Sequence, residues 1–484
     1  MARAALPQTD EEAWAAAAAW ATAGEMSPFE ALMWRAESDP RLRSPMTVVD
    51  VLDRAPDWRR LVAAHQWGTR LVPRARQRVV EPPLHLGAPA WAADPDFDLH
   101  HHLRRARVPP PGTLTQVLEL AEQMAMTPFD RARPLWEALL VEGMEGGGAA
   151  YLFKIHHSVT DGMGGIQLLS LLHSRRREPS RRTPMPPPPQ PARISPLSVL
   201  GGQVRRRLRA APAEAGRHLG SGMIALGRLA ADPVDAVGGA LRFGRSLQRV
   251  LAPPPAPPSP LLRGRSLSWR FGALECGVDA LRAAGRAAGG THGDADVAAG
   301  RGGVRRYHEH FGVAVDELPM AMPVSLRRDD HPMGGNRFAG ARLAAPVGEP
   351  DPGERIRLIH DLVLGARAEP AADALGLLAP ALSLVPTPLI TRWYAALTGG
   401  LDLQASNVPG IPHPVYIAGA RIERMYPFGP LPGCAVMTGL VSHVDTCCIG
   451  VNCDAAAVTD VDRFLDCLGE GLAEVLALAS HTGG

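Results

Sequence analysis

The sequence predicts an α/β (α+β) fold with two globular units, and three observations support this class. Helical and strand patterns alternate along residues 27–175 of the first unit, which spans residues 1–175. The second unit, residues 266–484, ends in a predicted hairpin followed by an amphipathic helix. Residues 176–265 between them hold a Pro/Arg-rich stretch and then helical composition, which is typical of a linker with a helical crossover.

The elements of the first unit follow from local patterns. One helix is predicted from apolar residues at helical spacing: Trp58, Leu61, Val62 and His65. Thr113 begins a second helix, because Gln116 three residues later completes a capping box. Strands are predicted at 135–141 and 149–157, and the glycines between them favour a turn.

The second unit is predicted to close with a hairpin and a helix. Residues 436–441 and 446–451 read as the two strands. The helix is indicated by its apolar stripe: Val461, Phe464, Leu465, Leu468, Leu472 and Val475. Five of the six cysteines lie after residue 430 without paired CxxC spacing, so we expect reduced, buried thiols rather than a zinc site.

Composition excludes some classes of function. The 484 residues carry 51 Lys and Arg against 49 Asp and Glu, a formal net charge of +2. A protein that binds nucleic acid through an overall positive potential needs a larger excess of basic over acidic residues, so we expect no nucleic-acid partner. No apolar run reaches the roughly 18 residues of a membrane span, and the N-terminal apolar stretch is too short for a signal peptide. We therefore expect a cytoplasmic protein.

Charge is concentrated in the crossover. From Arg193 to Arg265 there are twelve arginines against three acidic residues, a local excess of +9. Interleaved Leu and Val make a basic amphipathic element at a membrane surface one interpretation. A solvated connection between the two units is the other, and the residues alone leave both open.

The segment HHSVTDG, residues 156–162, is the sharpest candidate site. Side chains alternate along the preceding strand, so His156 and His157 point to opposite faces and should have different roles. Asp161 is placed to cap the next helix, and Gly162 permits close approach of backbone or ligand. A histidine at a strand end, neutral near pH 7, suits a general base.

Other chemistries fit this segment less well. Two histidines and Asp161 could be metal ligands, but the diverging histidines argue against it, and we expect no metal. No GxSxG, P-loop or GxGxxG occurs between a strand and a helix, so no covalent nucleophile is indicated.

The sequence resembles a known family at several motifs. HHSVTDG matches the HHxxxDG signature of acyl-CoA-dependent acyltransferases. The wider context is similar to bacterial wax ester synthase/diacylglycerol acyltransferases: SPFEALMWRAES (27–38), the PLW of DRARPLWEALLVEG (130–143), MPVSLRRDD (322–330), GGNRFAGARL (334–343) and SNVPG (406–410). Together these motifs cover roughly residues 25–480 and are more specific than HHxxxDG alone.

The resemblance implies two chloramphenicol-acetyltransferase-like domains with the active site in a tunnel between them. It implies that His157 is the catalytic base and that Asp161 supports the loop. The remaining candidates carried over are, for substrate binding, Gly162, Pro134, Leu135, Trp136, Ser325, Asn336, Ser406 and Asn407, and, for structural support, His156, Arg327 (as a partner of Asp161) and Asp294.

One segment departs from the family pattern. The family commonly has Thr-Val-Asn-Asp-Val, whereas this chain has Thr291 to Val297 with glycine at 293. Asp296 and Arg301 fall where the family is apolar, and buried charges are costly unless paired. The segment also holds Gly300, Gly302 and Gly303, and each glycine inside a helix costs roughly 1 kcal/mol relative to alanine. We expect this segment to be a weak point of stability or activity.

The resemblance implies an O-acyltransferase that uses acyl-CoA as a substrate, needs no cofactor, and acylates diacylglycerol or a long-chain alcohol. It implies a peripheral protein at the inner membrane face or on lipid inclusions. Two alternatives stay open: a different alcohol acceptor, such as a polyketide or glycolipid hydroxyl, and an inactive lipid-binding relic. Oligomeric state, acceptor and chain length are not determined by the sequence.

Overall fold

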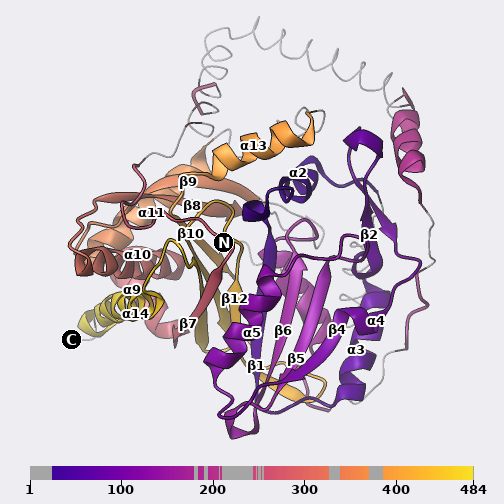
Figure 1. Cartoon of the computed structure of the whole chain (residues 1–484). Helices are drawn as coiled ribbons and strands as arrows, with labels where there is room; N and C mark the ends of the chain where they lie inside the picture. Colours follow the sequence, from indigo (N-terminus) through magenta and orange to yellow (C-terminus); the bar gives the residue numbers. More distant parts are fainter. Residues whose placement is uncertain are drawn as a thin grey trace, which may run out of the picture.

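Figure 1 shows the computed structural model of the chain. The structure describes residues 24–178, 184–189, 194–206, 208–209, 242, 244–246, 248, 252, 256–325, 338–369 and 385–482. Two six-stranded sheets lie next to each other, with α3 outside one of them and α9, α10, α11 and α14 outside the other (Figure 1). Each sheet has a hydrophobic core of its own, and a third core contains side chains from both halves.

The first sheet has the order β11-β12-β1-β6-β5-β4. Its strands are β1 (Pro45–Leu52), β4 (Leu103–Arg107), β5 (Trp136–Glu142), β6 (Ala149–His156), β11 (Tyr416–Ile417) and β12 (Ala420–Phe428). The helices that belong to this half are α2 (Pro28–Ala36), α3 (Trp58–Leu71), α4 (Leu99–His102), α5 (Leu114–Met126) and α6 (Gly162–Leu172). The Thr113–Gln116 capping box predicted for α5 is confirmed.

The second sheet has the order β7-β14-β13-β10-β8-β9. Its strands are β7 (Trp269–Gly277), β8 (Glu317–Ser325), β9 (Phe338–Pro346), β10 (Leu403–Val408), β13 (Val436–His443) and β14 (Thr446–Asp454). Its helices are α9 (Val278–Ala287), α10 (His292–His310), α11 (Pro352–Ala368) and α14 (Val461–Ala477), and α13 (Thr387–Thr398) packs on α2. The predicted hairpin and C-terminal helix are confirmed as β13, β14 and α14. A separate two-stranded sheet pairs β2 (Gln77–Val80) with β3 (Ala90–Ala93).

Strand exchange ties the two halves together. β12 comes from the second half of the chain but pairs antiparallel with β1, so that Thr47 faces Phe428. On its other side the backbone N–H of Met425 donates to Cys448 Sγ of β14 at 3.4 Å. The division at residues 175 and 266 made from composition did not anticipate that β11 and β12 join the first sheet.

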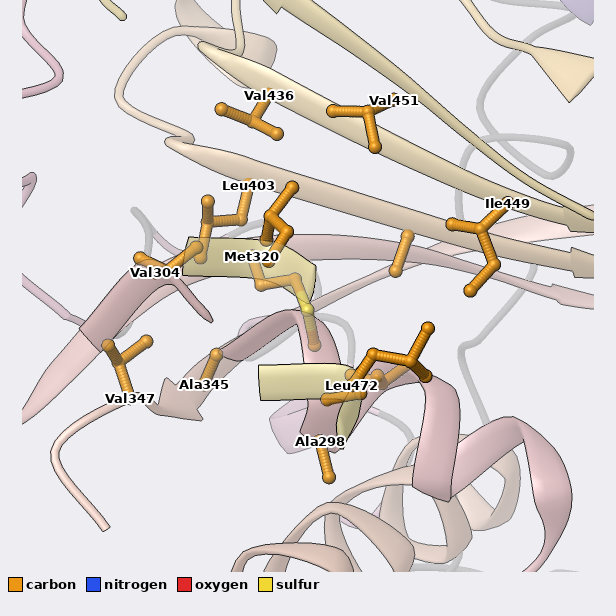
Figure 2. Close-up of a cluster of buried hydrophobic side chains, with 14 of the residues drawn as sticks. Ala298, Val304, Met320, Ala345, Val347, Leu403, Val436, Ile449, Val451 and Leu472 are labelled. Atoms are coloured by element: carbon orange, nitrogen blue, oxygen red, sulfur yellow. The ribbon is translucent and has the colours of Figure 1, made fainter. Parts of the chain in front are cut away.

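The core of the second half lies between its sheet and α10 and α14, and Figure 2 shows its central side chains. Gly303 and Gly471 lie where these two helices cross. A Cβ on Gly303 would be 2.5 Å from Leu468 Cα, and one on Gly471 would be 2.4 Å from Ala299 O. Both glycines therefore permit close helix packing, so Gly303 is not simply a cost as its helical position alone suggested.

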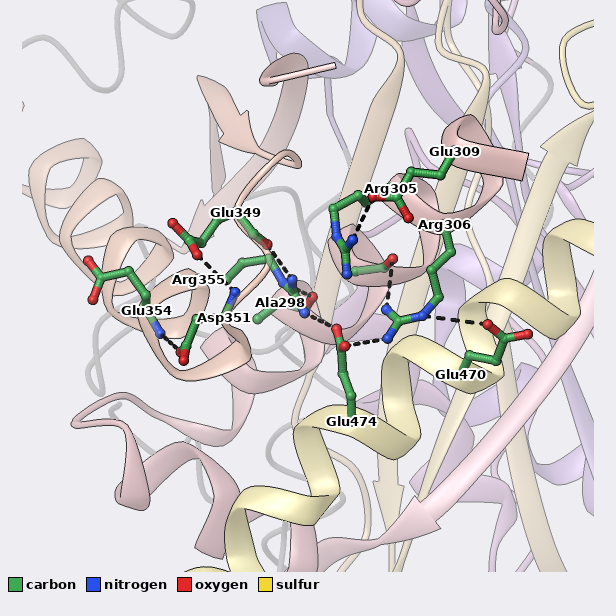
Figure 3. Close-up of polar contacts among 11 residues, drawn as sticks. Ala298, Arg305, Arg306, Glu309, Glu349, Asp351, Glu354, Arg355, Glu470 and Glu474 are labelled. Carbon is green, nitrogen blue, oxygen red and sulfur yellow. Dashed lines mark hydrogen bonds and ion pairs between the residues drawn. The ribbon is translucent and has the colours of Figure 1, made fainter. Parts of the chain in front are cut away.

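An ionic cluster around the buried Arg355 holds three helices of this half together (Figure 3). The fully buried Arg355 of α11 donates to Ala298 O of α10 at 2.8 Å and contacts the Glu474 carboxylate of α14. Arg306 of α10 binds the same carboxylate. Burial would raise the pKa of Glu474, but the two guanidinium groups hold it below its ordinary value. The cluster fixes α10, whose first turn reaches the candidate site.

Candidate active site

The HHSVTDG segment forms the turn between β6 and α6. β6 ends at His156, and His157 begins the turn with its side chain partly buried. The backbone N–H of His157 donates to Ser44 O at 2.9 Å, so the residue before β1 fixes the position of the turn. A partly accessible imidazole on a fixed backbone is what a general base at a strand end requires.

His156 is fully buried and hydrogen-bonded at both ring nitrogens. Its Nδ1 accepts from the backbone N–H of Ser158 at 3.0 Å, so a neutral ring carries its proton on Nε2. Nε2 donates to Glu37 Oε1 at 2.8 Å. Burial would raise the pKa of Glu37, but the contact with His156 and other polar contacts hold it below its ordinary value. Both nitrogens are used within the fold.

Asp161 caps α6, as the sequence predicted. It is buried, and its Oδ1 accepts from the backbone N–H of Gly164 at 2.9 Å. Gly162 follows as the first helical residue. A Cβ on Gly162 would lie 2.9 Å from Val408 Cγ2, a contact tighter than side chains normally make. The absence of a side chain at 162 therefore lets the end of β10, from the second half, approach the turn.

The PLW residues support the same strand end. The backbone N–H of His156 donates to Leu135 O at 3.0 Å, and Trp136 Nε1 donates to Ala75 O at 2.7 Å. The Trp136 carbonyl accepts from His102 Nδ1 at 2.7 Å. Pro134, Leu135 and Trp136 are all buried, so these residues hold the strand edge beside the histidine turn.

An apolar pocket lies beside the turn, between β6, α3 and α6. It holds about 540 Å³ of empty space, its open mouth included. Its walls are formed mainly by Leu135, Trp136, Phe153, Ile155, Val159 and Leu171. Phe153 and Ile155 share one face of β6, while Lys154 and His156 lie on the other. Most of the lining side chains are apolar, a property that suits an alkyl chain.

Ser406 and Asn407 lie partly buried on β10, whose last residue is Val408. Asn407 faces the start of α10, where a Cβ on Gly293 would be 2.9 Å from Asn407 Nδ2. β10 thus touches Gly162 through Val408 and α10 through Asn407. Three motifs far apart in the sequence meet at this strand end.

Asp294 has a structural role at the start of α10. It completes a capping box with Thr291, whose backbone N–H donates to Asp294 Oδ2 at 2.8 Å. His360 Nδ1 of α11 lies 2.8 Å from the same oxygen. These contacts tie the first turn of α10 to α11.

The two unusual charges of α10, Asp296 and Arg301, are both buried. Burial raises the pKa of Asp296 to about 7, and Arg301 opposes that shift. Arg301 donates from Nη1 to Met320 Sδ at 3.1 Å, while its Nε has no hydrogen-bond partner in the described structure. Between these two described side chains there is no ion pair in direct contact.

Two predicted site residues, Arg327 and Asn336, lie outside the described residues. Ser325 is the last residue of β8. Within the described part of the chain no cluster of three or more His, Cys, Asp or Glu residues could hold a metal ion. No helix there is both long and apolar enough to cross a bilayer.

The fold and the histidine turn define a two-domain acyltransferase of the HHxxxDG class. Models of the wax ester synthase/diacylglycerol acyltransferase catalytic domain and of the C-terminal domain of that family match residues 26–295 and 334–475. The chain belongs to the wax ester synthase/diacylglycerol acyltransferase family and is an acyl-CoA-dependent acyltransferase. The family predicted from the sequence is confirmed.

Relatives and solved structures agree with this assignment. The Mycobacterium tuberculosis protein named "Putative diacyglycerol O-acyltransferase Rv2484c" is 43% identical over 459 residues, which are 94% of this chain and 92% of that protein. A wax ester synthase/diacylglycerol acyltransferase from Marinobacter aquaeolei VT8 matches with TM-score 0.62 and 23% identity over 94% of this chain and all of that one.

The first condensation domain of the calcium-dependent antibiotic synthetase matches with TM-score 0.58 and 15% identity, over 95% of this chain and 97% of that chain. These structural matches confirm the predicted fold class of two chloramphenicol-acetyltransferase-like domains.

Sequence reasoning missed three residues that shape the turn: Glu37, Ser44 and Val408. Glu37 lies in the SPFEALMWRAES motif, which signalled the family but not a partner for His156. Ser44 acts through its backbone, which no side-chain pattern reveals. Val408 belongs to SNVPG, and its contact with Gly162 depends on the packing of the two halves.

Proposed function

We propose that this enzyme transfers a fatty acyl group from acyl-CoA to the hydroxyl of diacylglycerol or of a long-chain alcohol. The observation that carries the proposal is the partly buried His157 on a fixed turn, beside an apolar pocket and the junction with β10. The names of the relatives point to the same acceptors. Peripheral association with a membrane or lipid inclusion is part of this proposal.

In the proposed reaction His157 accepts the proton of the acceptor hydroxyl as its oxygen attacks the thioester carbonyl carbon. A tetrahedral intermediate forms, the C–S bond breaks, and the CoA thiolate takes the proton from the imidazolium. The ester and free CoA leave, and no acyl-enzyme is formed. General-base catalysis of this kind contributes about 10²–10⁴-fold to a rate.

The other residues have supporting roles in this proposal. Leu135 and Trp136 line the pocket for an alkyl chain. The preceding Pro134 contributes to substrate binding with them. Gly162 keeps the path beside the turn open, while Ser406 and Asn407 bind substrate from the β10 side together with Ser325 and Asn336. Asp161, His156 and Asp294 hold the backbone, with Arg327 as the proposed partner of Asp161.

The test is thiol release from palmitoyl-CoA by the purified full chain, with diacylglycerol, hexadecanol or no acceptor. Acceptor-dependent release that produces the matching ester, and that His157→Ala abolishes, supports the proposal. Release with neither acceptor but with another alcohol would replace the acceptor class. Absence of ester with any alcohol, although lipid binds, would overturn the enzymatic role in favour of a lipid-binding relic.

A further inference from the structure

Three neighbouring elements expose large apolar side chains at one edge of the molecule. Leu84 at the tip of the β2–β3 connection is 89% exposed, Leu197 of the helix at 196–206 is 72% exposed, and Leu389 of α13 is 55% exposed. We call the exposed set the apolar edge: Leu84, Leu86, Leu197, Val204, Leu208 and Leu389. We take these exposed apolar residues, gathered on three neighbouring elements, as a candidate interaction surface.

Two hydrogen bonds bring the three elements of the apolar edge together. His85 Nδ1 lies 2.7 Å from Thr387 Oγ1, which joins the loop to the first turn of α13. On the other side, Gln203 Nε2 donates to Ala88 O at 2.5 Å, which joins the loop to the helix at 196–206. Figure 1 shows α13, the loop beyond β2 and this helix, drawn in magenta, in a row along one margin.

The loop holds its leucines outward by an unfavourable backbone. Leu84 and His85 have φ values of 53° and 57°, in the left-handed region that side chains other than glycine rarely adopt. Residues in such conformations persist only when the surrounding structure imposes them, and they concentrate at functional sites. Here the conformation presents an apolar side chain to solvent instead of burying it.

The helix at 196–206 packs one face on the fold and exposes apolar side chains on the other. Val199 and Gln203 are buried against the β2–β3 sheet, while Leu197 and Val204 point to solvent. Exposed arginines accompany the apolar residues: Arg205 in this helix, Arg209 just after it, and Arg392 on α13. Arg206 is also exposed but forms an ion pair with Glu25. Arginine stems extend along apolar surface while their charged ends reach anionic headgroups.

We propose that the apolar edge docks on an anionic lipid surface, with its leucines inserted among the lipids and its arginines at the headgroups. Separate protruding leucines on three elements fit a soft lipid interface, and exposed arginines favour anionic lipid. This inference rests on the proposed function, because that function supplies the lipid substrate. It adds which face of the enzyme contacts the lipid surface. Docking at this edge brings a lipid acceptor to the enzyme without a membrane span.

The test is flotation of the full chain with vesicles of phosphatidylcholine alone or with phosphatidylglycerol, in the absence of substrate. The protein floats with the anionic vesicles, and Leu84→Ser/Leu86→Ser/Leu389→Ser lowers the bound fraction about tenfold. Leu197→Ser/Leu208→Ser lowers it similarly. Arg205→Gln/Arg209→Gln removes part of the preference for phosphatidylglycerol, and more so at low salt.

The matched control is Phe311→Ser/Leu358→Ser/Leu364→Ser, three exposed apolar residues away from the apolar edge. It floats like the unchanged protein. Lack of flotation by the unchanged protein, or an equal loss in the control, overturns the proposal. The proposal is also overturned if the unchanged protein is a dimer, the leucine variant of the loop is a monomer, and flotation is the same for both.

Thermal melts confirm that each variant folds. Because flotation needs no catalysis, His157→Ala floats normally, and an inactive enzyme that still floats would contradict only the proposed reaction.

Discussion

Glu37, which is partly buried, pairs with the fully buried His156, whose Nε2 lies 2.8 Å from Oε1 of the glutamate. The same oxygen accepts the backbone N–H of Ser44 at 2.8 Å, and Ser44 O accepts from the N–H of His157. One carboxylate therefore fixes the side chain of the first histidine and, through Ser44, the backbone of the second. The two adjacent histidines should respond differently to substitution.

We expect His157→Ala to lose esterification by about 10²–10⁴-fold, because the proposed base is removed. Its melting temperature should change little, since its backbone N–H to Ser44 is kept. Steady-state esterification and thermal melts of the purified variant measure both effects. Retention of most activity would show that the base is another group.

We expect His156→Ala to act mainly on stability. The change leaves the partly buried Glu37 carboxylate without its histidine donor, a loss of about 1–3 kcal/mol. The double variant Glu37→Gln/His156→Ala should lose less than the two single variants added together. An inactive His156→Ala with an unchanged melting temperature would contradict this role.

Asp161 is expected to contribute through its cap as well as through its charge. Asp161→Ala removes an N-cap worth about 1 kcal/mol and should lower both stability and rate. Asp161→Asn keeps an oxygen for the Gly164 N–H and should retain most of the stability. A lower rate in Asp161→Asn than in the parent, at equal melting temperature, would assign a separate role to the charge.

The contact between Gly162 and Val408 predicts a compensating pair. Gly162→Ala places a Cβ 2.9 Å from Val408 Cγ2 and should lower stability and activity. Val408→Ala removes that methyl group, so Gly162→Ala/Val408→Ala should recover much of the loss. Gly165→Ala is the matched control, because its Cβ would meet nothing within 4 Å. Additive effects of the two changes would argue against this contact.

Local signals in the sequence were sufficient for much of the site. The cap at Asp161 and the capping box at Thr113 depend on neighbouring residues, and both appear in the structure. The alternation along β6 appears as well, because Phe153 and Ile155 enter one core and Leu152 another. The position of β12 in the first sheet depends on a partner strand more than 350 residues away, at β1. No local pattern specifies such a pairing.

Helix packing explains another difference. Gly302 and Gly303 looked like weak points within α10 because a glycine in an isolated helix has only a cost. In the structure a Cβ on Gly302 would be 2.5 Å from Arg355 Nη2, and Gly303 lies against Leu468. The benefit arises from helices distant in sequence, which composition does not show.

The buried charges of α10 predict a stability that depends on pH. The pKa of Asp296 is raised to about 7, whereas an unfolded aspartate titrates near 4. Between these values the folded protein keeps a proton that the unfolded chain has lost, so stability from this group falls as pH rises toward 7. Gly293 takes no part in this titration. A side chain at position 293 would displace Asn407, so we expect Gly293→Asn alone to lower the stability of the folded protein.

Asp296→Leu/Arg301→Met should therefore be more stable than the parent at pH 8, by about 1–4 kcal/mol, because both buried charges are replaced by apolar groups. The gain should shrink at pH 4, where Asp296 is protonated. Denaturant unfolding at both pH values measures it. Asp296→Asn alone should gain less, since Arg301 then loses its nearest opposing charge.

The control is Glu354→Gln/Arg357→Gln, which removes an exposed ion pair on α11 and should not change the pH dependence of stability. An equal gain at pH 4 and 8 would show that Asp296 does not titrate in this range.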